Sequence, residues 1–105
     1  MSAPEPNPLR ERFRQNAHPR LAVMGELLDR LEANRGDGAA AGELLRHFHY
    51  FAGLGGTCGL PRVSAIGASG EEAVSAVISG REPLSDAAIG RCRALLEEVE
   101  LEVSR

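Results

Sequence analysis

The sequence contains no tryptophan and no lysine, and aromatic residues make up only 4% of it. A core with so few aromatic rings must be built mainly from Leu, Val, Ile and Ala, which favours helices packed on helices. All twelve basic residues are arginines, and the formal net charge is −3. They form no basic stripe with interleaved aromatic residues, which argues against nucleic-acid binding.

Long apolar runs are also missing, so we expect no membrane span and, without an apolar N-terminal segment, a cytoplasmic protein. Both cysteines, Cys58 and Cys92, fall on apolar helical faces and are expected to be small core residues rather than a disulfide. A chain of 105 residues predicts one domain, residues 1–105, able to bury a core without staples. Residues 1–6 are predicted to be a loose lead-in.

Apolar residues recur at helical spacing in five segments, and no segment alternates in the manner of a strand. The expected helices are residues 8–16, 19–34, 39–58, 61–79 and 86–103. Four substantial helices with short connections predict an all-α antiparallel up-down four-helix bundle, with the short helix 8–16 packed across one end. Gly67 and Gly70 lie on the inner face of helix 61–79, which predicts close contact with a neighbouring helix.

One helix carries the most unusual stretch of the chain. At about 100° per residue, one side of helix 39–58 gathers an apolar arc, consisting of Leu44, Phe48, Phe51, Leu54 and Cys58. His47 falls at the edge of this arc, and His49 falls almost opposite its centre, toward solvent. The neighbours of His49 on its own face are the small residues Ala52, Gly53 and Gly56.

These small neighbours have two interpretations. Each glycine inside a helix costs about 1 kcal/mol relative to alanine, so bare backbone beside an imidazole makes sense if a macromolecule must approach it closely. Alternatively, the glycines end the helix and His49 is an ordinary surface residue.

The run His49-Tyr50-Phe51-Ala52-Gly53, followed by Gly55-Gly56-Thr57 and Gly59-Leu60, resembles the signature of histidine phosphotransfer (HPt) domains. The family pattern reads approximately His-x-Leu-(Lys or Ala)-Gly followed by small residues, and its histidine carries a phosphoryl group. The resemblance assigns that role to His49 and not to His47, which has no glycine four residues later. Ala52 stands where many members have lysine, and whether this reduces activity is open.

The resemblance implies a four-helix bundle that acts as a phosphorelay intermediate, exchanging a phosphoryl group with the aspartate of a response-regulator receiver domain. A neutral imidazole is a competent nucleophile near pH 7, and the partner can supply the remaining chemistry. We therefore expect no cofactor on this chain and a Mg²⁺ ion on the receiver. The expected partners are a receiver domain, a hybrid sensor histidine kinase, or both, and the chain is expected to be a monomer. Arg46, three residues before His49, is either a contact for the phosphate or an ordinary surface arginine.

Two other function classes compete with this interpretation. An enzyme would have to use the histidines and cysteines, but His47 and His49 point to opposite sides of a helix and cannot share a metal. No Cys-x-x-Cys or His-x-x-x-His spacing exists, so we predict no metal site and no enzyme. The alternative that stays open is an HPt-like interaction module that binds a receiver or kinase domain through the same face, with His49 never phosphorylated.

Overall fold

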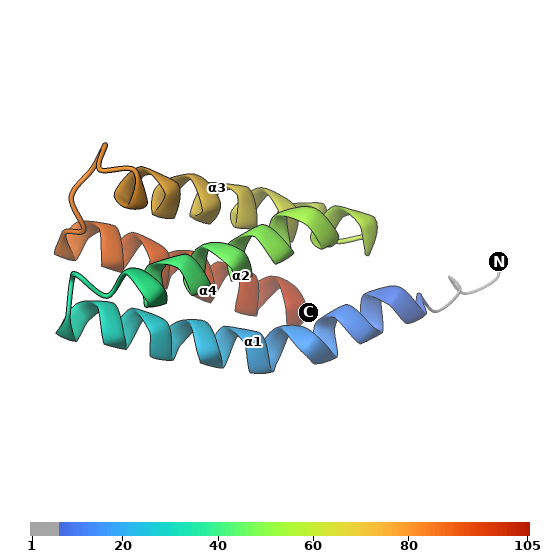
Figure 1. The fold of residues 1–105 in the computed structure, drawn as a ribbon. Helices are drawn as coiled ribbons and strands as arrows, with labels where there is room; N and C mark the ends of the chain where they lie inside the picture. Colours follow the sequence, from blue (N-terminus) through green and yellow to red (C-terminus); the bar gives the residue numbers. More distant parts are fainter. Residues whose placement is uncertain (1–6) are drawn as a thin grey trace, which may run out of the picture.

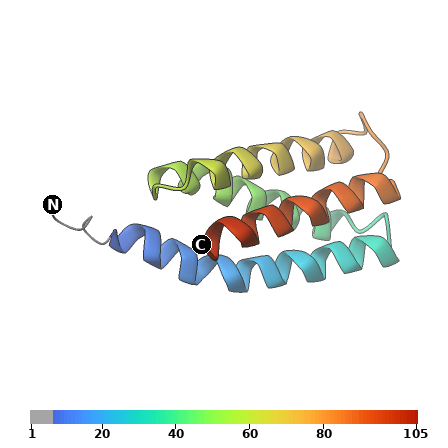
Figure 2. The same cartoon turned by 180° about the vertical axis from the view of Figure 1, so that it is seen from behind.

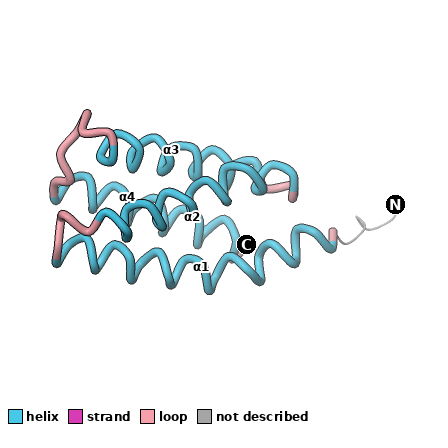
Figure 3. Tube along the Cα trace, in the orientation of Figure 1, coloured by secondary structure: helices cyan, strands magenta, loops and turns pink. Residues whose placement is uncertain are grey.

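The computed structural model describes residues 7–105 and is all-helical over that range, as expected (Figure 1; Figure 3). The described helices are α1 (Pro8–Ala33), α2 (Gly38–Thr57), α3 (Pro61–Ile78) and α4 (Asp86–Val103). The predicted lead-in, residues 1–6, lies outside the described residues.

Each helix packs against its neighbours in the chain, and α4 closes the arrangement by packing against α1. Short connections join successive helices at alternating ends of the molecule (Figure 1). The C-terminal end of α4 lies beside the middle of α1, so the first turns of α1 extend beyond it (Figures 1 and 2).

Helix ends lie where side chains can satisfy the free backbone groups of a terminal turn. The Asn7 side chain accepts a hydrogen bond from the Arg10 amide, and the Asp37 and Ser85 side chains do the same for α2 and α4. Helices α2 and α3 are each followed by a glycine with positive φ, Gly59 at 82° and Gly80 at 78°. A residue with a Cβ would be strained at both positions.

The separate N-terminal helix was a wrong prediction, because α1 runs unbroken through Pro19. Proline removes one helical hydrogen bond and was expected to end the first helix. Pro19 is exposed, however, so the carbonyl left unpaired one turn earlier faces the solvent side. The buried residues Phe13, Ala17 and Leu21 continue in one phase across the proline, and their burial holds the helix together.

The core is made of aliphatic side chains with three buried phenylalanines at its centre. Phe48 and Phe51 are fully buried, while Leu54, predicted to share their face, is 41% exposed. Gly55 is buried in its place, because α3 approaches α2 too closely for a larger side chain. Both cysteines are free and buried, as predicted.

Helices α2 and α3 form the closest pair in the bundle, and glycines on α3 make this possible. A Cβ on Gly67 would lie 2.5 Å from the Ala52 nitrogen and 2.9 Å from the Phe48 carbonyl oxygen. A Cβ on Gly70 would overlap the Phe48 ring. The Ser64 hydroxyl adds a 2.6 Å hydrogen bond across the pair to the Ala52 carbonyl. The close contact predicted for Gly67 and Gly70 is thus confirmed.

We predict that Gly67→Ala destabilises the protein by about 1–3 kcal/mol, because the added methyl group would meet backbone atoms that cannot move aside alone. The matched control is Gly90→Ala on α4, where a Cβ meets nothing within 4 Å. That change should stabilise by up to about 1 kcal/mol through helix propensity. Urea unfolding of the two variants measures the difference. Equal stability of the two variants would contradict the packing described for α2 and α3.

Candidate functional site

His49 projects from the middle of α2 on the side that faces α3. Its side chain is 73% exposed, in agreement with the predicted orientation. The structure also gives it a partner that the sequence analysis did not identify. The Nδ1 atom of His49 lies 2.5 Å from Oε2 of Glu71, a residue of α3 whose side chain is 34% exposed.

The Glu71 contact determines which ring nitrogen of His49 is free. A carboxylate can only accept a hydrogen bond, so Nδ1 must carry the proton in this pair. In the neutral imidazole Nε2 then keeps its lone pair. The arrangement presents a solvent-exposed nucleophilic nitrogen on a ring whose orientation is held from the opposite side.

The three small residues predicted to surround His49 lie differently from one another. Gly53 and Gly56 are exposed, and a Cβ on Gly53 would meet nothing within 4 Å. Ala52 is half-buried on the side of α3, where its carbonyl accepts the bond from Ser64. Open surface beside His49 is therefore provided by the two glycines, and Ala52 belongs to the contact between the helices.

Arg46 is exposed on the same side of α2 as Gly53. Its Nη1 atom lies 4.0 Å from the position of a Cβ on Gly42, so the side chain extends back along the helix, away from His49. A contact from Arg46 to a phosphate on His49 would need a different rotamer.

His47 points to the other side of α2, toward α1. Its Nδ1 atom accepts a 2.7 Å hydrogen bond from Nη1 of Arg20, which leaves the proton on Nε2 in the neutral ring. The guanidinium carbon of Arg20 also lies 3.5 Å from the centroid of the Tyr50 ring. Tyr50 in turn stacks on Phe13, with centroids 5.7 Å apart and an interplanar angle of 4°.

The surroundings of His47 keep its imidazole neutral. Burial lowers the pKa of His47, and the positive charge of Arg20 lowers it further, against a smaller opposing effect of Glu43. A charged imidazole is therefore disfavoured at His47 in the folded protein. The two histidines lie in different environments. His49 is exposed and paired with a carboxylate, whereas His47 is half-buried and paired with a cation.

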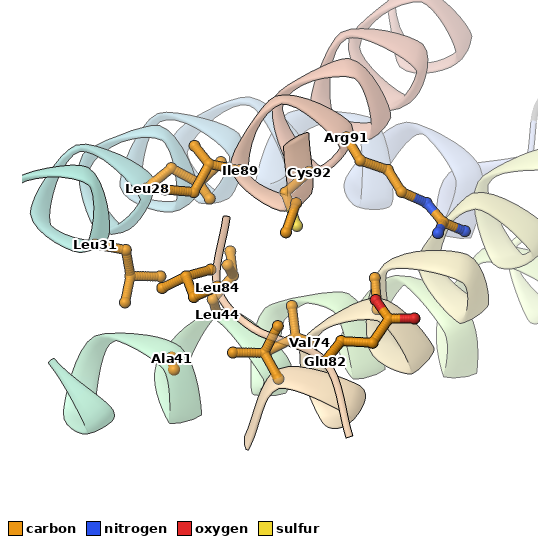
Figure 4. A pocket seen from close by; sticks show the side chains of 13 residues that line it. Leu28, Leu31, Ala41, Leu44, Val74, Glu82, Leu84, Ile89, Arg91 and Cys92 are labelled. Carbon is orange, nitrogen blue, oxygen red and sulfur yellow. The ribbon is translucent and has the colours of Figure 1, made fainter. Parts of the chain in front are cut away.

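Away from His49, an apolar cavity of about 40 Å³ lies between the four helices near the α3–α4 connection (Figure 4). Figure 4 shows aliphatic side chains such as Leu28 and Val74 around it, with Arg91 and Glu82 at its margin. Cys92 lines the cavity, but burial raises the pKa of its thiol, which opposes formation of the reactive thiolate. The cavity is therefore lined mainly by aliphatic side chains, with polar groups at its margin.

Sequence analysis had missed two residues of this region, Glu71 and Arg20. A signal for Glu71 existed, because Gly67 and Gly70 identify the face of α3 that contacts α2, and Glu71 follows at its edge. No comparable signal existed for Arg20. It follows Pro19, where the helix was expected to begin, and its partner His47 had been given no function.

Two features of residues 7–105 bear on other function classes. No helix in this range has the length and apolar character needed to cross a membrane. Nor does this range bring three His, Cys, Asp or Glu side chains together as a metal site would require.

Comparison with known protein families finds a match that covers nearly the whole chain. The model described as "Hpt domain" matches residues 8–102. No curated protein and no solved structure matches the chain.

The two histidine environments lead to a prediction for titration. In an NMR pH titration, His47 should titrate below the ordinary value of about 6.5. Arg20→Gln should move the pKa of His47 part of the way back, because burial, the larger cause, remains. A pKa of His47 at or above the ordinary value would contradict the structure.

The lowered pKa of His47 also makes the stability of the fold depend on pH. A histidine whose pKa is lowered by folding binds its proton more readily in the unfolded state, so stability falls as pH drops below about 6.5. This loss of stability levels off once the pH is below the pKa that His47 has in the folded protein. Compared with His47→Gln, the wild-type protein should therefore lose stability over that range in urea unfolding at a series of pH values.

Proposed function

The chain belongs to the Hpt domain family, and from this membership we propose that it is a phosphorelay intermediate whose phosphoacceptor is His49. Hpt domains are phosphocarrier modules of two-component signalling rather than classical enzymes, and they interact with receiver domains and histidine kinases. The observation that carries the assignment to His49 is its exposed imidazole with Nδ1 bonded to Glu71.

The proposed reaction is a reversible exchange between nitrogen and oxygen. The Nε2 lone pair of His49 attacks the phosphorus of an aspartyl phosphate on a receiver domain. An N–P bond forms while the P–O bond to the aspartate breaks, and the carboxylate leaves with the electron pair. The reverse step returns the phosphoryl group to an aspartate.

Glu71 is proposed to hold the ring for this step. It fixes the proton on Nδ1 and so keeps Nε2 available, and it balances the positive charge that the ring gains on phosphorylation. Glu71 does not touch the phosphoryl group and therefore acts as a positioning residue. Gly53 and Gly56 are proposed to leave room for the receiver, with Ala52 behind them.

The rest of the reaction chemistry is proposed to come from the partner, including the Mg²⁺ ion. We propose a receiver domain, a hybrid sensor histidine kinase, or both as partners of a monomeric, cytoplasmic chain. Arg46 is proposed to reach the phosphate only after turning away from Gly42.

The alternative is a module that binds the same partners without being phosphorylated. Ala52 favours this alternative. A lysine at this position would bring positive charge close to the phosphoryl group, and an alanine supplies no such charge. The environment of His49 favours phosphorylation, since a binding-only surface gains nothing from an imidazole oriented by a carboxylate. Chemical labelling of the histidine decides between the two.

We predict that His49→Gln abolishes labelling by phosphoramidate and by a phosphorylated receiver. Since His49 is exposed, helicity and melting temperature should change little. The label on the wild-type protein should be acid-labile and alkali-stable, as expected for a phosphoramidate bond. Detection by native mass spectrometry from a neutral volatile buffer avoids the acidic conditions that would hydrolyse this bond.

The matched control is His47→Gln, which should still accept the phosphoryl group although it loses the contact with Arg20. Labelling that persists in the His49 variant would refute the assignment. A wild-type protein that binds a receiver but is never labelled would support the binding module.

A second prediction concerns access to His49. Gly53→Arg places a long side chain beside the imidazole, where the structure has free space, so the protein should fold with unchanged or higher stability. Transfer from a receiver should fall by about two orders of magnitude, because misplacement by about 1 Å has that effect on rate. Labelling by phosphoramidate, which needs less room, should fall much less.

Gly90→Arg on α4 is the matched control, because a Cβ there also meets nothing within 4 Å. It should leave transfer from the receiver unchanged. Wild-type transfer by the Gly53 variant would show that the glycines beside His49 do not serve close approach.

A further inference from the structure

Arg20 is the centre of a side-chain cluster that the proposed phosphotransfer does not use. The guanidinium stacks on Tyr50 and donates to His47, and its Nε atom is buried without a partner. Both contacts are made with neutral groups, so they hold the arginine in place without neutralising its charge. Arg20 is a preorganised cation.

Arg20 belongs to the half of the twelve arginines that form no ion pair with a carboxylate in residues 7–105. Six arginines in the described part of the chain form ion pairs with carboxylates, namely Arg14, Arg30, Arg35, Arg62, Arg93 and Arg105. No such pair is formed by Arg20 within residues 7–105, although it is more firmly held by its neighbours than an exposed arginine. A side chain that is ordered but left unpaired is suited to receive an anion from outside.

An open groove surrounds this cation. It is lined by Asn16, Pro19, Arg20, Val23, His47 and Tyr50, and it contains no acidic side chain. The amide of Asn16, the Tyr50 hydroxyl and the Nε2–H of neutral His47 are further hydrogen-bond donors there. The first half of α1 is also basic, since residues 7–24 contain four arginines and one glutamate in a chain of net charge −3.

The groove lies beside the proposed phosphoacceptor. Tyr50 directly follows His49 on α2, and the two side chains point about 100° apart around the helix axis. Glu71 borders His49 on the α3 side, whereas the Arg20–Tyr50 stack borders the same exposed surface on the α1 side. Gly53 lies one turn after His49 at an angle between those of His49 and Tyr50, and no side chain covers the surface there. Arg46 lies on the same side one turn before His49, with its side chain extended toward Gly42.

We propose that Arg20, held by Tyr50 and His47, receives an acidic side chain of the receiver domain that covers His49. This inference rests on the proposed function, and it makes Arg20 a specificity-determining residue rather than a catalytic one. The contact would form with the partner's carboxylate and would favour receivers that carry one at this position.

The test uses the receiver that exchanges phosphate fastest with wild-type protein among the receiver domains of the same organism. At low receiver concentration, Arg20→Gln should slow transfer by about fivefold and Arg20→Glu by more, since one charge pair at an interface rim is worth about 1 kcal/mol. Arg20→Lys, which keeps the charge but not the planar stack, should fall between Arg20→Gln and wild type. The matched controls Arg91→Gln and Arg91→Glu alter an exposed arginine on α4 and should transfer like wild type.

Other readouts separate recognition from damage to the fold or to His49. Labelling by phosphoramidate should stay within about twofold of wild type in all Arg20 variants, because His49 itself is unchanged. The difference in transfer rate between wild type and Arg20→Gln should become smaller as salt is raised from about 50 to about 500 mM, because salt screens an exposed charge pair. Exchanging acidic residues of the receiver for lysine, one at a time, should give one variant that restores transfer with Arg20→Glu.

Failure of the proposed function and failure of the role of Arg20 give different results. If no donor labels His49 in the wild-type protein, the proposed function fails and this inference falls with it. If His49 is labelled and the Arg20 variants transfer like the Arg91 variants, only the role of Arg20 is refuted. Competition of inorganic phosphate with the receiver, abolished by Arg20→Gln without any rescue by a receiver variant, would mean that the groove binds a free anion instead and would also overturn the proposal.

Discussion

The close approach of α2 and α3 is the constraint on which the proposed site depends. The α3 backbone at Gly67 lies so close to the Ala52 nitrogen that no methyl group fits between them. Gly70 leaves the space that the Phe48 ring occupies. At this separation Glu71 can reach the His49 ring from the neighbouring helix. A wider spacing would leave His49 with no partner to fix its proton, so the packing of the core and the chemistry of the surface share one cause.

The two histidines of α2 lie in different environments, because one faces α3 and the other faces α1. Toward α3, His49 meets a carboxylate and stays open to solvent; toward α1, His47 meets a guanidinium and is half-buried. Burial and positive charge lower the pKa of His47 and keep it neutral. As a result Nδ1 is a donor in one ring and an acceptor in the other, and two residues only two positions apart are suited to different tasks.

Much of this arrangement could be predicted from the sequence, because helical periodicity sets which side of a helix is buried. The exposure of His49, the burial of Phe51 and the role of Gly67 follow from the phase of the apolar residues. The prediction failed at Pro19, where a local rule about proline outweighed the continuous phase of Phe13, Ala17 and Leu21. It also failed for Leu54 and Glu71, whose environments depend on the distance between two helices, which the periodicity of one helix does not contain.

The glycines of α2, of α3 and of the connection between them differ in what an added side chain would meet. Gly55, Gly67 and Gly70 are buried against the neighbouring helix, and Gly59 has a positive φ, so the fold requires each of them. Gly53 is exposed inside a helix, with nothing near its missing side chain. Alanine there would stabilise the helix by about 1 kcal/mol, so folding alone does not account for this glycine. Its position, one turn after His49 and between that imidazole and the Arg20–Tyr50 stack, is accounted for if a partner must lie flat across this surface.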